Sequence, residues 1–250
     1  MAEPALALRD YPQIIDLISV LEQNGLQKQK EEVQALVGYI GRMEETLSQM
    51  MDEMKEMRLE VGKLHDKGFR ARCSQLVGAA EGKIHQVKSM VSMTKENLIS
   101  SAKQMVQTFR EKGRSALCHA AQALRIPSVL SRMGRGFAHA EKSMEQLAVR
   151  LDAMREELHQ AGGHIKNAGI ALAGKEPQES KELSADKGVL AKLRSFVLYC
   201  GKAFSKMDRD TALTVERING GRSSVKTELQ GLKSAQAGQR RQAASKEQAR

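Results

Sequence analysis

The chain has 250 residues, of which 3% are aromatic, with no Trp and 13 Met. Because aromatic side chains fill much of a compact globular interior, this composition disfavours a compact globule and predicts an all-α protein of long helices with narrow cores. The three cysteines are an odd number without a CxxC pair, which argues against a disulfide framework or a zinc ribbon.

The formal net charge of +10 is unevenly spread along the chain. Residues 1–66 carry 7 basic and 13 acidic side chains, whereas residues 67–126 carry 11 basic and 3 acidic ones. A basic protein can bind nucleic acid or an anionic membrane surface. The asymmetry favours another interpretation, in which the acidic first segment neutralises the basic second segment within the fold.

The first expected elements are a flexible lead-in over residues 1–10 and a short amphipathic helix that begins at Pro12 and ends at Asn24–Gly25. A long helix over residues 26–66 follows, and the short helix should fold back on its start. The apolar residues of the long helix alternate at steps of three and four, which is the seam of a coiled coil. These residues are Val33, Leu36, Ile40, Met43, Leu47, Met50, Met54, Met57, Val61 and Leu64.

The seam breaks at Lys67–Gly68, because the next strong apolar residue after it is Phe69. We expect Gly68 to end the helix and a hairpin to follow, with one continuous helix as the alternative. The next helix, over residues 69–112, repeats apolar positions at intervals of eleven, which keeps the apolar stripe straight. Packed antiparallel on the first long helix, it would bring Lys83, Lys88 and Lys95 near Glu44, Asp52, Glu53 and Glu56.

Gly113 should interrupt this helix, with a short helix over residues 115–125 and a second break at Ile126–Pro127. Residues 128–173 then carry the longest seam, thirteen apolar positions from Leu130 to Leu172 without a miss. Glycines directly after its d positions would let another helix approach closely, and these are Gly134, Gly162 and Gly169.

The C-terminal third is expected to be less regular. Residues 176–184 are polar with a Pro and should form a linker. Helices over residues 185–232, broken at Asn219, Gly220 and Gly221, should form a smaller C-terminal part, followed by a disordered basic tail over residues 233–250.

The predicted fold is therefore all-α, an elongated antiparallel helical hairpin or three-helix coiled-coil bundle over residues 11–175 with the smaller C-terminal part attached. Self-association through an unfilled seam is the alternative to a bundle closed within one chain.

Side chains that could bind metal or perform catalysis lack the spacing that such sites need. Glu156-x-x-His159 resembles half of a di-iron motif, but both positions face away from the seam, and His164 lies five residues beyond. Five methionines could form a thioether site, yet four of them lie on the seam, where Met is ordinary core filler. We therefore predict no catalytic, cofactor or metal site. The methionines are Met43, Met50, Met51, Met54 and Met57, and the cysteines, none with a His at ligand spacing, are Cys73, Cys118 and Cys200.

Two basic clusters are candidates for weak nucleic-acid contact. Single-strand binders usually alternate such charges with aromatic side chains, and here Phe69 is the only aromatic residue nearby. Solvated surface and pairing within the chain are therefore the favoured interpretation. The clusters are Lys67, Arg70 and Arg72, and in the tail Arg240, Arg241, Lys246 and Arg250.

Several motifs follow one another between residues 11 and 175, and more loosely to residue 232. They are Ile14-Ile15-Asp16-Leu17-Ile18 with Asn24-Gly25, then Val33-x-x-Leu36-Val37-x-Tyr39-Ile40-x-x-Met43-Glu44, Glu81-Gly82-Lys83-Ile84, Phe109-x-Glu111-Lys112-Gly113-x-Ser115-Ala116-Leu117, and His164-Ile165-x-Asn167-x-Gly169-x-Ala171-Leu172-Ala173-Gly174-Lys175. This order resembles an uncharacterised family of helical proteins of gut Firmicutes, commonly encoded on conjugative or other integrative mobile elements. The resemblance implies a bacterial cytosol and a mobile-element context, without any functional residues.

The expected function is that of a non-enzymatic protein–protein interaction or scaffold protein with an unknown protein partner. The alternative is a nucleic-acid-associated accessory factor in conjugation. Because the sequence shows no signal peptide and no run of about 18 apolar residues, we expect a cytoplasmic protein with reduced thiols and no membrane contact.

Overall fold

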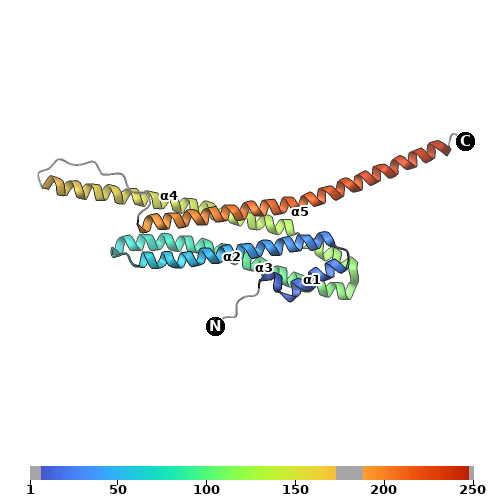
Figure 1. Ribbon diagram of the computed structural model, residues 1–250, viewed down its shortest axis with the longest axis horizontal. Helices are drawn as coiled ribbons and strands as arrows, with labels where there is room; N and C mark the ends of the chain where they lie inside the picture. The colour runs from blue at the N-terminus through green and yellow to red at the C-terminus, as the bar shows by residue number, and fades with distance from the viewer. Residues whose placement is uncertain (1–6, 173–187, 248–250) are drawn as a thin grey trace.

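The computed structural model describes residues 7–172 and 188–247, except for the side chains at positions 165, 169 and 220–247. These residues form helices joined by short connections, which confirms the predicted all-α fold. The long helices lie antiparallel to one another along one axis (Figure 1). The elements are η1 Leu8–Asp10, α1 Pro12–Gln23, α2 Gln27–Gly62, α3 Lys67–Ala123, α4 Ile126–Leu172 and α5 Val189–Glu247.

The N-terminal residues differ from a flexible lead-in where they are described. Residues 8–10 form the 3-10 helix η1, and Leu8 is fully buried because this large apolar side chain packs on the core beside α2. The short helix α1 begins at Pro12 and is followed by Asn24–Gly25, as predicted. It packs on both α2 and α3.

Helices α2 and α3 form the predicted hairpin, not one continuous helix. Asp66 caps the start of α3, because its Oδ1 accepts a hydrogen bond from the Phe69 backbone N–H at 2.6 Å. The prediction that Gly68 ends the preceding helix was wrong, since α2 already ends at Gly62 and Gly68 lies in the first turn of α3.

Gly113 reverses the chain within α3. Its φ of 74° and ψ of −167° are non-helical and lie in a region that glycine adopts far more readily than other residues. The chain after Gly113 runs back along the chain before it, so that Met90 of α3 packs directly against Gly136 of α4. Both predicted interruptions are confirmed, because the returning helix is broken again just before Ile126 by Arg125, whose φ is 44°.

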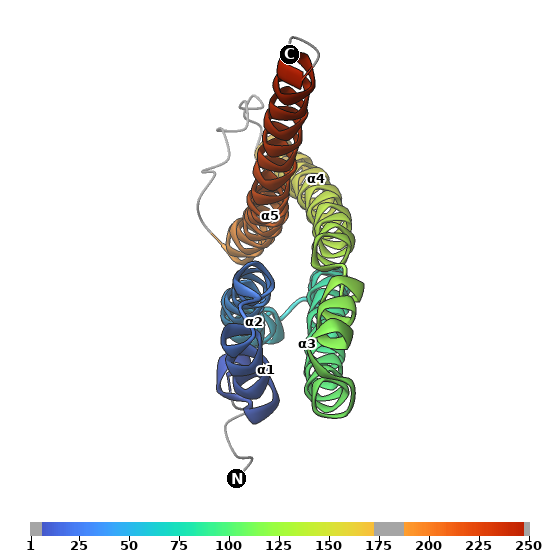
Figure 2. The same cartoon turned by 90° about the vertical axis from the view of Figure 1, so that its right-hand side faces the viewer.

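Helices α2, α3, α4 and α5 occupy the corners of an antiparallel bundle when viewed along its axis (Figure 2). Helix α5 lies beside α2, and α4 lies beside α3, while the most extensive contact of α4 is with α5. The three-helix body expected from the sequence is therefore completed by a fourth helix, which the sequence assigned to a smaller C-terminal part.

The C-terminal boundaries stay predictions. The expected linker over residues 176–184 lies outside the described residues. The predicted break at Asn219, Gly220 and Gly221 was wrong, because the backbone of α5 is helical through these residues and onward to Glu247. Side chains of α5 are described only up to residue 219.

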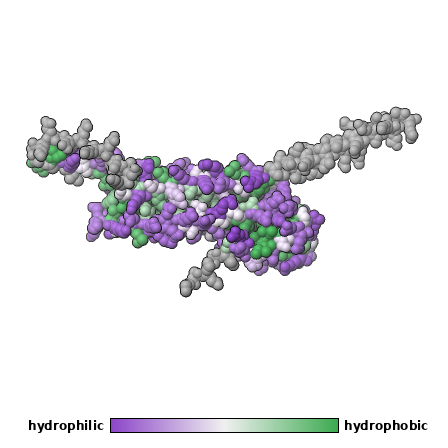
Figure 3. Space-filling view, in the orientation of Figure 1, coloured by the Kyte–Doolittle hydropathy of each residue, from purple (hydrophilic) through white to green (hydrophobic). Residues whose placement is uncertain are grey.

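The predicted seams fill the core. Of the ten residues predicted for the first seam, eight are buried, and Met57 of α2 and Leu64 just after α2 are partly buried against them. The eleven-residue repeat of α3 faces the same interior through Ala80, Val91 and Ala102. The outer surface shown in Figure 3 is mostly hydrophilic.

Ion pairs between α2 and α3 neutralise part of the opposite charge on the two segments. Lys95 Nζ lies 2.8 Å from Glu44 Oε1, which confirms the predicted pairing for these two residues. Arg58 Nη2 lies 2.7 Å from Glu81 Oε2. Lys83 differs from the prediction, because it donates to Gln86 on its own helix at 3.4 Å.

Two residues fix the position of α5. The buried Tyr39 hydroxyl of α2 hydrogen-bonds to the Met207 carbonyl and to the Thr211 hydroxyl of α5. On α4, a Cβ at Gly134 would lie 2.8 Å from Asp208 Oδ1 and 3.3 Å from Thr211 Cγ2, so glycine gives α5 room to lie close to α4 here. The predicted role of Gly134 in close helix approach is thus confirmed.

Candidate functional site

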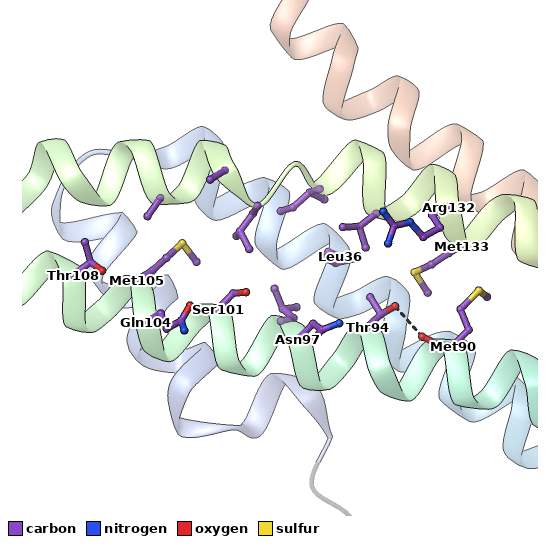
Figure 4. A pocket seen from close by; sticks show the side chains of 16 residues that line it. Leu36, Met90, Thr94, Asn97, Ser101, Gln104, Met105, Thr108, Arg132 and Met133 are labelled. Atoms are coloured by element: carbon purple, nitrogen blue, oxygen red, sulfur yellow. Dashed lines mark hydrogen bonds between the residues drawn. The ribbon is translucent and has the colours of Figure 1, made fainter.

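A groove runs between the two arms of the Gly113 hairpin (Figure 4). One wall is α3 from Met90 to Thr108, a length of about 27 Å at 1.5 Å per residue. The facing wall is formed by Ala120 to Met133, at the end of α3 and the start of α4. The groove has a volume of about 420 Å³, within the range of ligand-binding clefts.

The α3 wall of the groove carries a polar stripe. Its members recur at steps of three and four, which places them on one face of the helix. The apolar residues that hold α3 on the core, such as Leu98, lie on the adjoining face. The stripe consists of Thr94, Asn97, Ser101, Gln104 and Thr108.

The groove stays open because its walls do not complement each other. Ala120 and Ala123 on the facing wall are too short to fill the space in front of the polar stripe. The apolar seam of α4 is directed mainly towards α5, with which α4 makes its most extensive contact. The two arms of the hairpin therefore lack a shared apolar seam along this stretch.

Methionines and one α2 residue form the floor of the groove. Met105 and Met133 are buried, Met90 is partly buried, and Leu36 of α2 contributes from below. Met is flexible and polarisable and adapts to irregular apolar surfaces. Among the described residues, Arg132 is the only charged side chain that lines the groove, and it is exposed.

This combination of side chains is suited to binding. An apolar floor beside a polar wall matches an amphipathic segment, whose apolar face would enter the groove while its polar face meets the hydroxyls and amides of α3. The Arg132 guanidinium supplies positive charge at the rim.

The five methionines considered as a thioether site belong to the core. Met43, Met50 and Met54 are buried, and Met51 and Met57 are partly buried among other apolar side chains. Their sulfur atoms serve packing, as the seam positions predicted.

The histidines of α4 and the cysteines lie apart from the groove. Glu156 and His164 are exposed, His159 is half-buried, and Glu156 accepts a hydrogen bond from Gln160 at 3.0 Å. Burial raises the pKa of the Cys200 thiol to about 12 and also raises that of Cys73. Cys118 is half-buried and accepts a hydrogen bond from Gln122 at 3.7 Å.

The first basic cluster lies at the tip of the α2–α3 hairpin. Lys67 and Arg70 are exposed, and Arg72 Nη1 lies 4.0 Å from Glu157 Oε2 of α4. The side chains of the second cluster, at positions 240, 241, 246 and 250, lie outside the described residues.

Sequence reasoning missed both the groove and the Tyr39 contact. The recurring polar positions from Thr94 to Thr108 are a signal that could have indicated a second, non-core face of α3. The hydrogen bonds of Tyr39 join residues more than 160 positions apart, so no local pattern indicated them.

Two features are absent from the described residues. No three His, Cys, Asp or Glu side chains converge there as metal ligands do. None of the described helices combines the length and the apolar character that crossing a membrane requires.

Comparison with known proteins identifies one family. The model of a family of unknown function, DUF6674, matches residues 10–250, which is nearly the whole chain. Neither a curated protein nor a solved structure matches the sequence. The chain therefore belongs to the family of unknown function DUF6674.

Proposed function

We propose that this protein is a non-enzymatic interaction protein of the bacterial cytoplasm, and that the groove between α3 and α4 receives an amphipathic helix of a protein partner. The groove carries the proposal, because it is long and apolar at its floor and polar along one wall. The association with a mobile element rests on the resemblance of the motif order described above.

The basic charge of α3 and of the groove rim favours an acidic partner helix. Residues 67–126 carry 11 basic and 3 acidic side chains, and Arg132 stands at the rim. Complementary charge at an interface steers association and selects against partners of the same sign. The methionine floor would tolerate some variation in the apolar side chains that enter.

A designed peptide tests this proposal. A fluorescein-labelled helix of about 18 residues, long enough to span the groove at 1.5 Å per residue, would carry Leu along one face and Glu elsewhere. We expect fluorescence anisotropy to detect binding, with affinity reduced at least tenfold by Ala123→Trp, because the indole fills the groove. The exposed control Ala138→Trp on α4 should bind as the wild type does.

The contribution of charge to peptide binding is tested separately. A peptide with Lys in place of Glu should bind more weakly, and Arg132→Glu should weaken the acidic peptide while Arg135→Glu, exposed outside the groove, should change it little. Equal binding to Ala123→Trp and wild type, or no binding of the acidic peptide at about 100 μM protein, would contradict the proposal.

The second candidate function is nucleic-acid association as an accessory factor in conjugation. The exposed Lys67 and Arg70 at the free hairpin tip support it, whereas the contact of Arg72 with Glu157 reduces the charge available there.

A further inference from the structure

The apolar seam of α4 is covered along most of its length and uncovered at its end. All eight seam positions from Leu130 to Met154 are buried. By contrast, Leu158 is 44% exposed and Leu172 is 91% exposed, although both continue the same alternation of three and four. The two seam alanines between them, Ala161 and Ala168, are exposed as well.

The seam becomes uncovered because both neighbours of α4 end. Arg194 Nε of α5 lies 2.5 Å from Asp152 Oδ1, and this antiparallel register places Val189, where α5 begins, beside about residue 156 of α4. Near the tip of the α2–α3 hairpin, Arg72 Nη1 lies 4.0 Å from Glu157 Oε2 of α4. The remainder of α4 projects beyond the bundle (Figure 1), and apolar side chains are visible on its end (Figure 3).

The projecting end of α4 has a glycine directly after a d position, as α4 also has where α5 packs on it. Gly134 follows a d position, and a Cβ there would lie 2.8 Å from Asp208 Oδ1 of α5. Gly162 occupies the equivalent heptad position, and a Cβ there would have nothing within 4 Å. Gly162 therefore leaves room at this heptad position for another helix to approach closely.

We propose that residues 157–172 of α4 pair antiparallel with the same segment of a second copy, forming a two-fold symmetric dimer. In an antiparallel pair, each a position faces a d position of the other helix. The a positions here are 158, 165 and 172, and the d positions are Ala161 and Ala168. Pairing Leu172 with Ala161 also places position 165 opposite Ala168, so these layers set a large residue against a small one, and Leu158 lies at the edge of the pair.

Other arrangements satisfy the seam less well. A parallel pair would stack alanine on alanine and leave these layers unfilled. The sequence of residues 173–187 contains Pro177 and, as its only large apolar residue, Leu183, so it does not continue the alternation of apolar positions. At the flanks of the antiparallel pair, glycine faces glycine and His164 faces Ala171 of the other copy. No charges of the same sign therefore face each other across the pair.

Light scattering behind a sizing column tests the dimer. At about 100 μM protein, wild type should show twice the monomer mass of 27.6 kDa and dissociate on dilution, as expected for a short interface. Gly162→Leu raises helix propensity, so the helix should persist, but it blocks close approach and should give a monomer. The matched control Gly82→Leu, exposed on α3 with nothing within 4 Å of its Cβ, should remain dimeric.

Cysteine cross-linking tests the orientation in a chain that also carries Cys118→Ser. A mixture of Ala161→Cys and Leu172→Cys chains should form the mixed disulfide under a mild oxidant, while neither variant alone should cross-link efficiently. A monomeric wild type at about 100 μM, an unchanged dimer in Gly162→Leu, or cross-linking of Ala161→Cys with itself would overturn the antiparallel dimer. The groove is a separate surface, so its peptide assay is unaffected by either result.

Discussion

At the scale of single residues, Tyr39 combines a core position with a polar contact across the bundle. Its side chain is 1% exposed, and its hydroxyl meets both the Met207 carbonyl and the Thr211 hydroxyl. The Thr211 hydroxyl also donates to the Met207 carbonyl at 2.8 Å, so this carbonyl and hydroxyl remain bonded to each other if the phenol is removed.

Tyr39→Phe should therefore lower the free energy of unfolding at neutral pH by about 1 kcal/mol, the usual net value of one hydrogen bond. Urea denaturation followed by circular dichroism would measure the difference. The control Tyr11→Phe keeps the ring that Lys95 contacts at 5.4 Å and should have a smaller effect. A loss above about 3 kcal/mol would indicate that partner groups are left unsatisfied.

The Tyr39 phenol should also make the free energy of unfolding depend on pH in the alkaline range. Burial raises the pKa of Tyr39 from 10.0 to about 12, so the unfolded chain releases this proton first as the pH rises. The stabilisation is fully present below pH 10 and is lost between about pH 10 and 12, by about 2 kcal/mol at the upper end. The Phe variant lacks this component, so the two stabilities should converge and cross. A constant difference from pH 7 to 12 would contradict this assignment.

At the scale of elements, the Gly113 turn decides where the groove lies. Met90 reaches Gly136, and Thr108 faces the Ala120 side of the groove, only because the chain reverses at a conformation with φ of 74° and ψ of −167°. A side chain with a Cβ is strained in this region by roughly 1–3 kcal/mol.

Gly113→Ala should destabilise the protein by about 1–3 kcal/mol in urea titrations, because the strain is confined to the folded state. Gly78→Ala is the matched control, since Gly78 lies exposed within the same helix with nothing near its Cβ. That substitution should stabilise the protein by about 0.5–1 kcal/mol through helix propensity. If Gly113→Ala is neutral or stabilising, as the control is expected to be, the turn tolerates a Cβ.

The helices and their breaks were predictable because they depend on local spacing and on local turn chemistry. The seam of α2, the interruption at Gly113 and the role of Gly134 all follow from periods within single helices. The docking of α5 on α2 and α4 was not predictable in this way, since Tyr39 and Thr211 are brought together by tertiary packing. The apolar period of α4 likewise predicts the length of this helix. It does not predict that the neighbouring helix α5 begins near Leu158.

At the scale of the whole molecule, the excess positive charge must be divided between internal pairs and a free surface. Lys95 with Glu44, Arg58 with Glu81, and Arg194 with Asp152 each join two different helices, so part of the basic excess is already paired. Pairs at the surface contribute little to stability, and the main effect of these partly exposed pairs is to lower the positive potential that nucleic acid would meet.

We therefore expect labelled duplex DNA to bind only at low ionic strength and to be undetectable with about 10 μM protein at about 150 mM salt. At low salt, replacing Lys67 and Arg70 by Gln should reduce the slope of log affinity against log salt by about 2, because each lost phosphate contact removes about 0.9. The control pair Lys142→Gln and Arg150→Gln, exposed on α4, should change it less. Micromolar binding at about 150 mM salt that the tip variant abolishes and the control preserves would instead favour nucleic acid as the partner.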